Sequence, residues 1–235
     1  MNSHLSGGEN TIQEIADFAK KLGYAGIIIN DDFESLEKIE QLKEEISQVE
    51  TDLEIYPGTT IRMENVKNIS DFKNILSKVR EKVLIVTVAG GDYRINRAAC
   101  EDPRVDILTH PELGRTDSGL DEPILKSASV NNVVIEINFR EILNSFRKPR
   151  SYILNHVAAN IRLCDHFRIP MIISSDAKSA WELRPPREMV SMANSLGLDL
   201  GKAFAAVTSI PQGIIENNKK TLEGKKITEG VELVE

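Results

Sequence analysis

The stretch VLIVTVAGGDYRINRAACEDPRVDILTHP, residues 83–111, decides the fold class of this chain. Its first six residues are apolar or β-branched without alternation, which is typical of a strand buried on both faces of a parallel sheet. Gly90-Gly91 permits a tight turn, residues 92–100 can form a short helix, and residues 105–108 begin the next apolar run. The stretch therefore predicts one βαβ unit.

The same alternation recurs along most of the chain. Further apolar runs at residues 27–29, 53–55, 133–137 and 171–174 predict strands. Helical spacing of apolar residues fills the segments between them, and Thr11-x-x-Glu14 has the form of a capping box at one helix start. Strands and helices that alternate every 25–35 residues or so predict a distorted TIM-like (β/α) barrel of about seven strands with outer helices. A doubly wound open sheet is the alternative.

The 235 residues, 41% of them hydrophobic, are sufficient for one large domain. We expect a single β/α barrel domain over residues 1–215 and a charged, flexible tail over residues 216–235, which lacks an apolar stripe. No apolar run approaches about 20 residues and no signal peptide opens the sequence, so we expect a cytoplasmic protein without a membrane partner. Cys100 and Cys164 lack CxxC spacing and nearby histidines, which favours reduced core thiols.

In barrels of this type the functional groups lie at the carboxyl ends of the strands. This rule places one set of side chains on a common rim: Asp31, Asp32, Thr59, Arg62, Gly91, Arg94, His110, Arg115, Glu136, Asn138, Asp176 and Lys178. Gly90-Gly91 at a helix start raises the possibility of a site for a sugar phosphate or another small anion. The simpler interpretation is that these glycines only form the turn.

Acids and a histidine on this rim raise a second possibility, a divalent-metal-dependent phosphoesterase. Such a site needs several His, Asp or Glu side chains that converge on two or three cations. Of the four histidines, His156 and His166 fall in a predicted helix away from the rim, which leaves His4 and His110. Because two imidazoles with some carboxylates are a thin ligand set, we expect no metal site in this chain.

The order of the strand ends resembles the polymerase and histidinol phosphatase superfamily of distorted β/α barrels. The matching positions are His4, Asp31-Asp32, Pro57-Gly58, His110-Pro111, Glu136-Ile137-Asn138 and Ser174-Ser175-Asp176. Members carry an Asp-x-His metal motif near the end, whereas this chain reads Asp176-Ala177-Lys178. A lysine cation cannot replace a metal-bound imidazole without a large cost. The enzyme alternative would retain a reduced site at His4, Asp31, His110, Glu136 and Asp176.

A closer resemblance covers nearly the whole chain. It rests on ordered blocks: GGD at 90–92, INRAA at 95–99, VDIL at 105–108, VIEINF at 134–139, SSDA at 174–177 and WELRPPR at 181–187. These blocks resemble the archaeal form of the thirty-kilodalton protein subunit of ribonuclease P. The chain departs from that family at its start, because Met1 to Leu5 is short and polar where an apolar strand is common.

This resemblance implies a non-catalytic, RNA-binding subunit that supports RNA-catalysed removal of the 5′ leader from precursor tRNA. The implied partners are ribonuclease P RNA and a small ribonuclease P protein subunit, in a heterodimer or heterotetramer, with precursor tRNA contacted indirectly. No cofactor is implied for this chain, and magnesium is expected for the RNA of the holoenzyme.

The net charge of −7 excludes a uniformly basic protein but allows a local basic surface. Five acids, Glu34, Glu37, Glu40, Glu44 and Glu45, fall on one predicted helix, whereas many cations fall near strand ends and loops. Arginine suits phosphate through its bidentate fork, and folded RNA is recognised largely through backbone and shape. We predict an RNA-binding set of Arg62, Arg94, Arg97, His110, Arg115, Lys126, Asp176, Lys178, Arg184 and Arg187.

Each member of that set also has a simpler interpretation. A single arginine is more often a solvated or ion-paired surface residue. His110 before Pro111 can cap a strand through a buried hydrogen bond, and Asp176 can orient Lys178 or Arg94, because a carboxylate facing phosphates would repel them.

Overall fold

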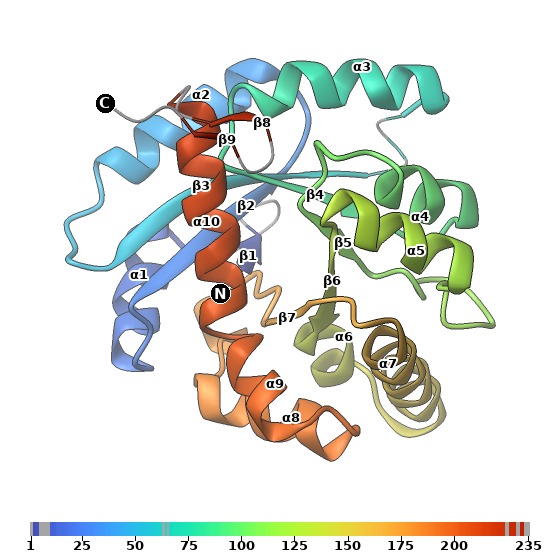
Figure 1. The fold of residues 1–235 in the computed structure, drawn as a ribbon. Coiled ribbons are helices and arrows are strands. Elements are labelled where there is room, and N and C mark those ends of the chain that lie inside the picture. Colours follow the sequence, from blue (N-terminus) through green and yellow to red (C-terminus); the bar gives the residue numbers. More distant parts are fainter. Residues whose placement is uncertain are drawn as a thin grey trace.

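The computed structural model describes residues 2–4, 10–62, 64, 66–223, 226–228 and 231–232. Seven strands form one sheet in the order β1-β2-β3-β4-β5-β6-β7, and every neighbouring pair is parallel. The strands are β1 (Asn2–His4), β2 (Gly26–Asp32), β3 (Glu54–Ile61), β4 (Ile85–Ala89), β5 (Ile107–Thr109), β6 (Val134–Asn138) and β7 (Met171–Ser174). The sheet curls into the predicted distorted barrel (Figure 1).

Helices lie around the outside of the curled sheet (Figure 1). They are α1 (Ile12–Lys21), α2 (Leu36–Ser47), α3 (Ile69–Arg80), α4 (Tyr93–Cys100), α5 (Glu122–Asn131), α6 (Phe139–Asn144), α7 (Arg147–Phe167), η2 (Ala180–Glu182), α8 (Pro186–Ser195), α9 (Leu200–Ala205) and α10 (Ser209–Leu222). A second sheet pairs β8 (Lys226–Thr228) with β9 (Val231–Glu232). None of the helices in the described ranges is long and apolar enough to cross a membrane.

Local sequence rules explain individual elements. The predicted capping box opens α1: the Thr11 hydroxyl accepts a hydrogen bond from the Glu14 amide at 3.2 Å, and the Glu14 carboxylate accepts one from the Thr11 amide at 2.9 Å. The βαβ unit is also confirmed, with β4, α4 and β5 in that order. Cys100 and Cys164 are buried free thiols, and burial raises the pKa of each to about 12.

Two layers of side chains line the interior of the barrel. The layer toward the amino ends of the strands is apolar and consists of Ile28, Ile85, Ile107, Val134 and Ile172. Two residues further along each of the same strands comes a buried polar side chain: Asn30, Thr87, Thr109, Glu136 and Ser174. Because residues i and i+2 of a strand face the same side, each strand places one residue in each layer. The polar layer therefore lies beneath the predicted rim.

Helix α10 covers the amino-terminal end of the barrel and lies in the foreground of Figure 1. Its Ile210, Ile214 and Ile215 pack against the apolar layer. Its buried Asn218 donates hydrogen bonds to the Leu84 carbonyl oxygen at 3.0 Å and to Asp106 at 2.8 Å. The helix continues to Leu222, past residue 215 where we expected the domain to end, because Asn218 satisfies groups inside the barrel.

Two boundaries differ from those that the sequence predicted. Strand β3 runs through Pro57-Gly58 to Ile61, six residues past the apolar run at residues 53–55 that predicted it. Gly58 makes this possible, because a Cβ there would lie 1.9 Å from the Asn30 side-chain oxygen. Helix α7 begins at Arg147, four residues before the expected start at Ser151. Both differences matter for the functional site.

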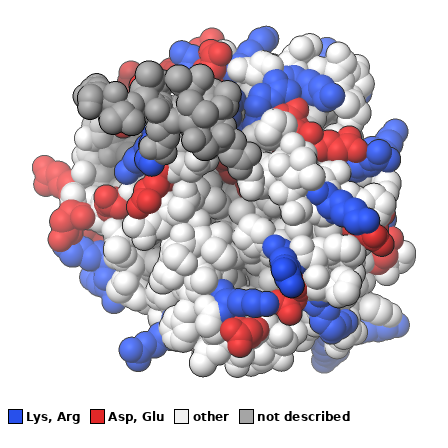
Figure 2. Space-filling view, viewed as in Figure 1, with Lys and Arg blue, Asp and Glu red and all other residues white. Residues whose placement is uncertain are grey.

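The molecular face that carries α10 has no single dominant charge. Basic and acidic side chains are interspersed around its margin, and its centre is largely uncharged (Figure 2). A basic surface must therefore be sought elsewhere, at the carboxyl ends of the strands.

Candidate nucleic-acid interface

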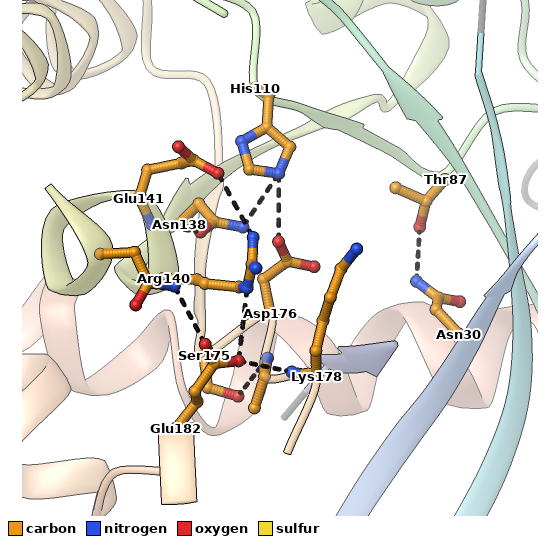
Figure 3. A network of polar contacts seen from close by, with 12 residues as sticks. Asn30, Thr87, His110, Asn138, Arg140, Glu141, Ser175, Asp176, Lys178 and Glu182 are labelled. Atoms are coloured by element: carbon orange, nitrogen blue, oxygen red, sulfur yellow. Dashed lines mark hydrogen bonds and ion pairs between the residues drawn. The ribbon is translucent and has the colours of Figure 1, made fainter. Parts of the chain in front are cut away.

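A buried polar cluster connects three strand ends at the rim. His110 follows β5, Asn138 ends β6 and Asp176 comes shortly after β7. The His110 Nε2 atom lies 3.3 Å from Asp176 Oδ2 and 3.2 Å from Asn138 Nδ2 (Figure 3). Both His110 (φ 49°) and Asp176 (φ 47°) have left-handed backbone conformations, which are uncommon outside glycine. The cluster thus depends on an unusual backbone at two strand ends.

Burial and nearby acids act in opposite directions on the pKa of His110. Burial alone would lower the pKa of His110, but the hydrogen bond and charge of Asp176, with the charges of Glu112 and Glu136, raise it above its ordinary value. The His110 and Asp176 side chains are each only 4% exposed. We predicted both as RNA contacts, but a macromolecule cannot reach either in this conformation. They join β5 to β7 instead.

Unsatisfied polar atoms mark the layer beneath this cluster. Asn30 donates to the Thr87 hydroxyl at 3.2 Å, yet no described residue supplies a hydrogen-bond partner for Asn30 Oδ1 or for the hydroxyls of Thr60, Thr109 and Ser174 (Figure 3). Among the residues with described side chains, no three His, Cys, Asp or Glu gather closely enough to hold a metal ion. The side chain of His4, another candidate ligand, lies outside the described residues.

The buried side chain of Asn96 packs against the Gly90-Gly91 turn. Asn96, fully buried, accepts a hydrogen bond from the Gly91 amide at 3.1 Å and donates to the carbonyl oxygens of Pro111 at 2.9 Å and Gly119 at 2.8 Å. Asp92 caps α4 with its carboxylate. An acidic cap disfavours an anion at this helix start, so the glycines form a tight turn and not the phosphate site considered above.

Several predicted RNA-binding cations form ion pairs with neighbouring acids. Arg62 Nε lies 2.6 Å from Asp32 Oδ1, and Arg97 Nε lies 2.7 Å from Glu101 Oε1. Arg115 makes two contacts with Asp117, at 2.6 and 2.8 Å. The corresponding partners of Arg94 and Lys126 are Asp92 and Glu122. Lys126 also lies on α5, an outer helix, and not on a rim loop.

The remaining predicted cations lie in the β7–α8 connection or in the first turn of α8 and have no carboxylate partner among the described residues. They are Lys178, Arg184 and Arg187. The Lys178 side chain extends toward Asn30 and Thr87 (Figure 3). The Arg184 guanidinium donates to the carbonyl oxygens of Trp181 at 2.8 Å and Leu183 at 2.7 Å and lies 5.8 Å from the Phe139 ring centroid.

Glu182 joins this connection to α6. Its carboxylate accepts hydrogen bonds from the Lys178 amide at 2.7 Å, from Asn144 Nδ2 at 2.9 Å and from Arg140 Nε at 3.3 Å. Burial raises the pKa of Glu182, but these donors and the Arg140 charge outweigh it and lower the pKa below its ordinary value. The Glu182 carboxylate therefore holds the β7–α8 connection against helix α6.

Sequence reasoning missed a further basic segment beside α6. Arg147, Lys148 and Arg150 occupy the first turn of α7, and all three are exposed. The signal was present in the sequence, as three cations within four residues, but the segment had been placed before the helix.

Two sides of the rim can now be distinguished. The β4–β5 side carries Arg94, Arg97 and Arg115, each beside an acid. The β6–β7 side carries one cation beside acids, Arg140, whose partners are Glu141 and Glu182. It also carries Arg147, Lys148, Lys178, Arg184 and Arg187, none of which forms an ion pair with a described carboxylate.

Comparison with known proteins identifies the family. A family model described as RNase P subunit p30 matches residues 1–222. The chain belongs to the RNase P subunit p30 family. Among curated relatives, ribonuclease P protein component 3 of Methanosarcina barkeri is 32% identical over 228 residues, covering 97% of this chain and 91% of the relative. The protein of the same name from Methanocaldococcus jannaschii is 34% identical over 186 residues and covers 78% of each chain.

Solved structures agree with membership in the RNase P subunit p30 family. A chain in a cryo-EM structure of archaeal ribonuclease P with mature tRNA matches with a TM-score of 0.81 and 28% identity, over 100% of this chain and 98% of that chain. A Xaa-Pro dipeptidase matches with a TM-score of 0.63 at 11% identity, over 93% of this chain and 75% of that chain. That second match shows a shared fold alone.

Proposed function

We propose that this chain is a non-catalytic, RNA-binding protein subunit of ribonuclease P, which supports RNA-catalysed removal of the 5′ leader from precursor tRNA. The observation that carries the proposal is the match over the full length of the chain to a component of archaeal ribonuclease P. The proposed partners are ribonuclease P RNA and a small protein subunit of the same particle, in a heterodimer or heterotetramer. Magnesium acts on the RNA and not in this chain.

The rim geometry supports binding over catalysis. The buried His110–Asp176 pair faces inward, and the described side chains include no cluster of metal ligands. On the β6–β7 side Arg147, Lys148 and Arg187 are exposed and suited to phosphates, because none of them forms an ion pair with a described carboxylate. The chain therefore contributes to the particle by holding RNA in place.

The test is leader removal from a precursor tRNA at modest magnesium. Three mixtures are compared: ribonuclease P RNA alone, this chain with its small protein partner but without RNA, and all components together. We expect efficient cleavage only when the RNA and the proteins are combined. Cleavage by the proteins without RNA would refute the non-catalytic role, and an RNA whose activity is unchanged by the proteins would refute the supporting role.

A further inference from the structure

We infer that residues 146–152, at the junction of α6 and α7, bind unpaired nucleotides of an RNA. In this inference Phe146 and Tyr152 stack on bases, while Arg147 and Lys148 contact phosphates. The inference rests on the proposed function and names the part of the RNA that one surface recognises.

The first observation is an excess of positive charge where a helix is least able to accept it. The first turn of α7 contains Arg147, Lys148 and Arg150 and no acidic residue. The amino end of a helix carries partial positive charge, so these cations are unfavourably placed in the free protein. Neither Arg147 nor Lys148 forms an ion pair with a described carboxylate. A bound anion would offset both charges.

Backbone hydrogen bonds from Arg150 hold the junction together. The Arg150 guanidinium donates to the carbonyl oxygens of Ser145 at 2.6 Å and Leu143 at 3.4 Å. These bonds fold the end of α6 against the start of α7. The Phe146 side chain cannot cap the helix, and no side-chain cap is present. Arg150 thus holds the turn while the neighbouring cations remain free to bind.

The second observation is independent of charge. Phe146 is 68% exposed and Tyr152 is 53% exposed, although aromatic residues make up only 5% of the chain. Lys148 Nζ lies 5.7 Å from the Tyr152 ring centroid, so cation and ring occupy one surface. Exposed aromatic rings beside cations are the arrangement that binds single strands, because every base offers a π-face. Duplex bases are already stacked and offer no such face.

The third observation is position. Helix α6 begins directly after β6, so the junction adjoins the carboxyl end of the barrel. Glu182 bonds to Asn144, three residues before Arg147, and the Arg184 guanidinium lies over the Phe139 ring. Through Glu182 and Phe139, the segment that carries Lys178 and Arg184 packs against α6, so an RNA strand held by those cations can extend to the junction.

The experiment uses the full chain and two RNA probes, a ten-nucleotide oligouridine and a blunt duplex of equal charge, with binding measured by fluorescence anisotropy at several salt concentrations. We expect Phe146→Ala with Tyr152→Ala to weaken oligouridine binding by about 30-fold or more, since each stacked base contributes roughly tenfold. Duplex binding should change by less than about threefold. Phe146→Leu removes one ring but retains an apolar side chain. Its loss of oligouridine affinity should be about half that of the double alanine variant on a logarithmic scale.

The phosphate contacts have a separate signature. Arg147→Ala with Lys148→Ala should lower the salt slope of oligouridine binding by about 1.4, the value for two single-strand phosphates. Arg162→Ala is the matched control: it removes an exposed arginine from the same helix, about four turns further on, and should leave affinity unchanged. Urea unfolding midpoints equal to that of the parent chain verify that each variant is folded.

The outcomes separate this inference from the proposed function. If the parent chain supports leader removal and the aromatic variants bind oligouridine as it does, this inference is refuted and the proposed function stands. Variants that bind oligouridine normally but no longer bind the small protein subunit identify the junction as a protein interface and also refute it. A parent chain that neither binds RNA nor supports leader removal refutes both.

Discussion

The β4–β5 and β6–β7 sides of the rim contain the same kinds of basic residue but differ in how many of them are ion-paired. On the β4–β5 side Arg97 and Arg115 are held by Glu101 and Asp117 at 2.7 and 2.6 Å. On the β6–β7 side Lys178 and Arg187 have no such partner among the described residues. An ion-paired arginine adds little positive potential, because its partner cancels the charge at a distance. The comparison teaches that cations must be counted together with the acids beside them.

The two sides also differ in how firmly the backbone is held. The β4–β5 side is closed around Asn96, which bonds to three backbone groups in two loops. The β6–β7 side is held by the partly buried carboxylate of Glu182 and by Arg150. The first side therefore has a mainly structural role, and the second is available for binding.

The largest expected effect comes from opening the β4–β5 side. Asn96→Ala leaves the Gly91 amide and the Pro111 and Gly119 carbonyls without partners, and each buried unsatisfied group costs about 1–3 kcal/mol. We expect the free energy of unfolding to fall by about 3 kcal/mol in urea titrations. Arg97→Ala on the same helix, which breaks only an exposed ion pair, should leave the unfolding midpoint nearly unchanged. Similar losses for the two variants would contradict this structural role.

The next effect concerns the buried pair that connects the two sides. Because the folded-state pKa of His110 is raised, its protonation stabilises the fold fully below the ordinary value of 6.5, and this stabilisation is lost as pH rises through the raised pKa. Asp176→Asn should lower the free energy of unfolding at pH 6 by about 2 kcal/mol and flatten its dependence on pH above the ordinary histidine value of 6.5. Asparagine tolerates the left-handed backbone at this position, so the substitution tests the charge. Urea unfolding at each pH is the measurement, and an unchanged pH profile would contradict the assignment.

A smaller effect separates the two sides by RNA affinity. Lys178→Gln with Arg187→Gln should weaken binding of ribonuclease P RNA by about tenfold, or 1.4 kcal/mol, near 0.1 M salt and lower the salt slope. The matched control removes one complete ion pair from the other side, Arg97→Gln with Glu101→Gln, and should change affinity less than about twofold. Filter binding across a salt series measures both. Equal losses would show that paired arginines contribute as much as unpaired ones.

The smallest effect runs in the opposite direction. Glu101→Gln frees Arg97 from its partner and should raise RNA affinity by about threefold at low salt. The same salt series should show that the gain disappears as salt rises, because exposed charges are screened. Unchanged or weaker binding would place the β4–β5 side away from RNA.

Much of the fold could be predicted because it depends on local pattern. The β-branched run of residues 83–88, the Gly90-Gly91 turn and the following helix became β4, the turn and α4. The apolar run at residues 53–55 did not show that β3 continues through Pro57-Gly58, because the reason for Gly58 lies on a different strand, at the Asn30 side chain. The close contact between Gly58 and Asn30 cannot be recognised until β2 and β3 are paired.

The candidate site was less predictable, for two different reasons. The burial of His110 and Asp176 depends on three strand ends meeting, which no local rule gives. The ion pairs of Arg97 with Glu101 and of Arg115 with Asp117 could have been predicted from the sequence, since spacings of four and two residues permit local contact. The basic start of α7 was overlooked because the helix was expected to begin later.

The position of α10 has a consequence for how the chain is made. Strands β2, β4 and β5 present an apolar inner layer that remains open to water until Ile210, Ile214 and Ile215 cover it. Asp106 and the Leu84 carbonyl likewise lack the hydrogen bonds that Asn218 donates until this helix has been made. On the ribosome, therefore, the barrel cannot complete its core until nearly the whole chain has emerged. The earliest strands must be protected from aggregation for most of synthesis, and a message truncated shortly before codon 210 would yield a chain that exposes its own interior.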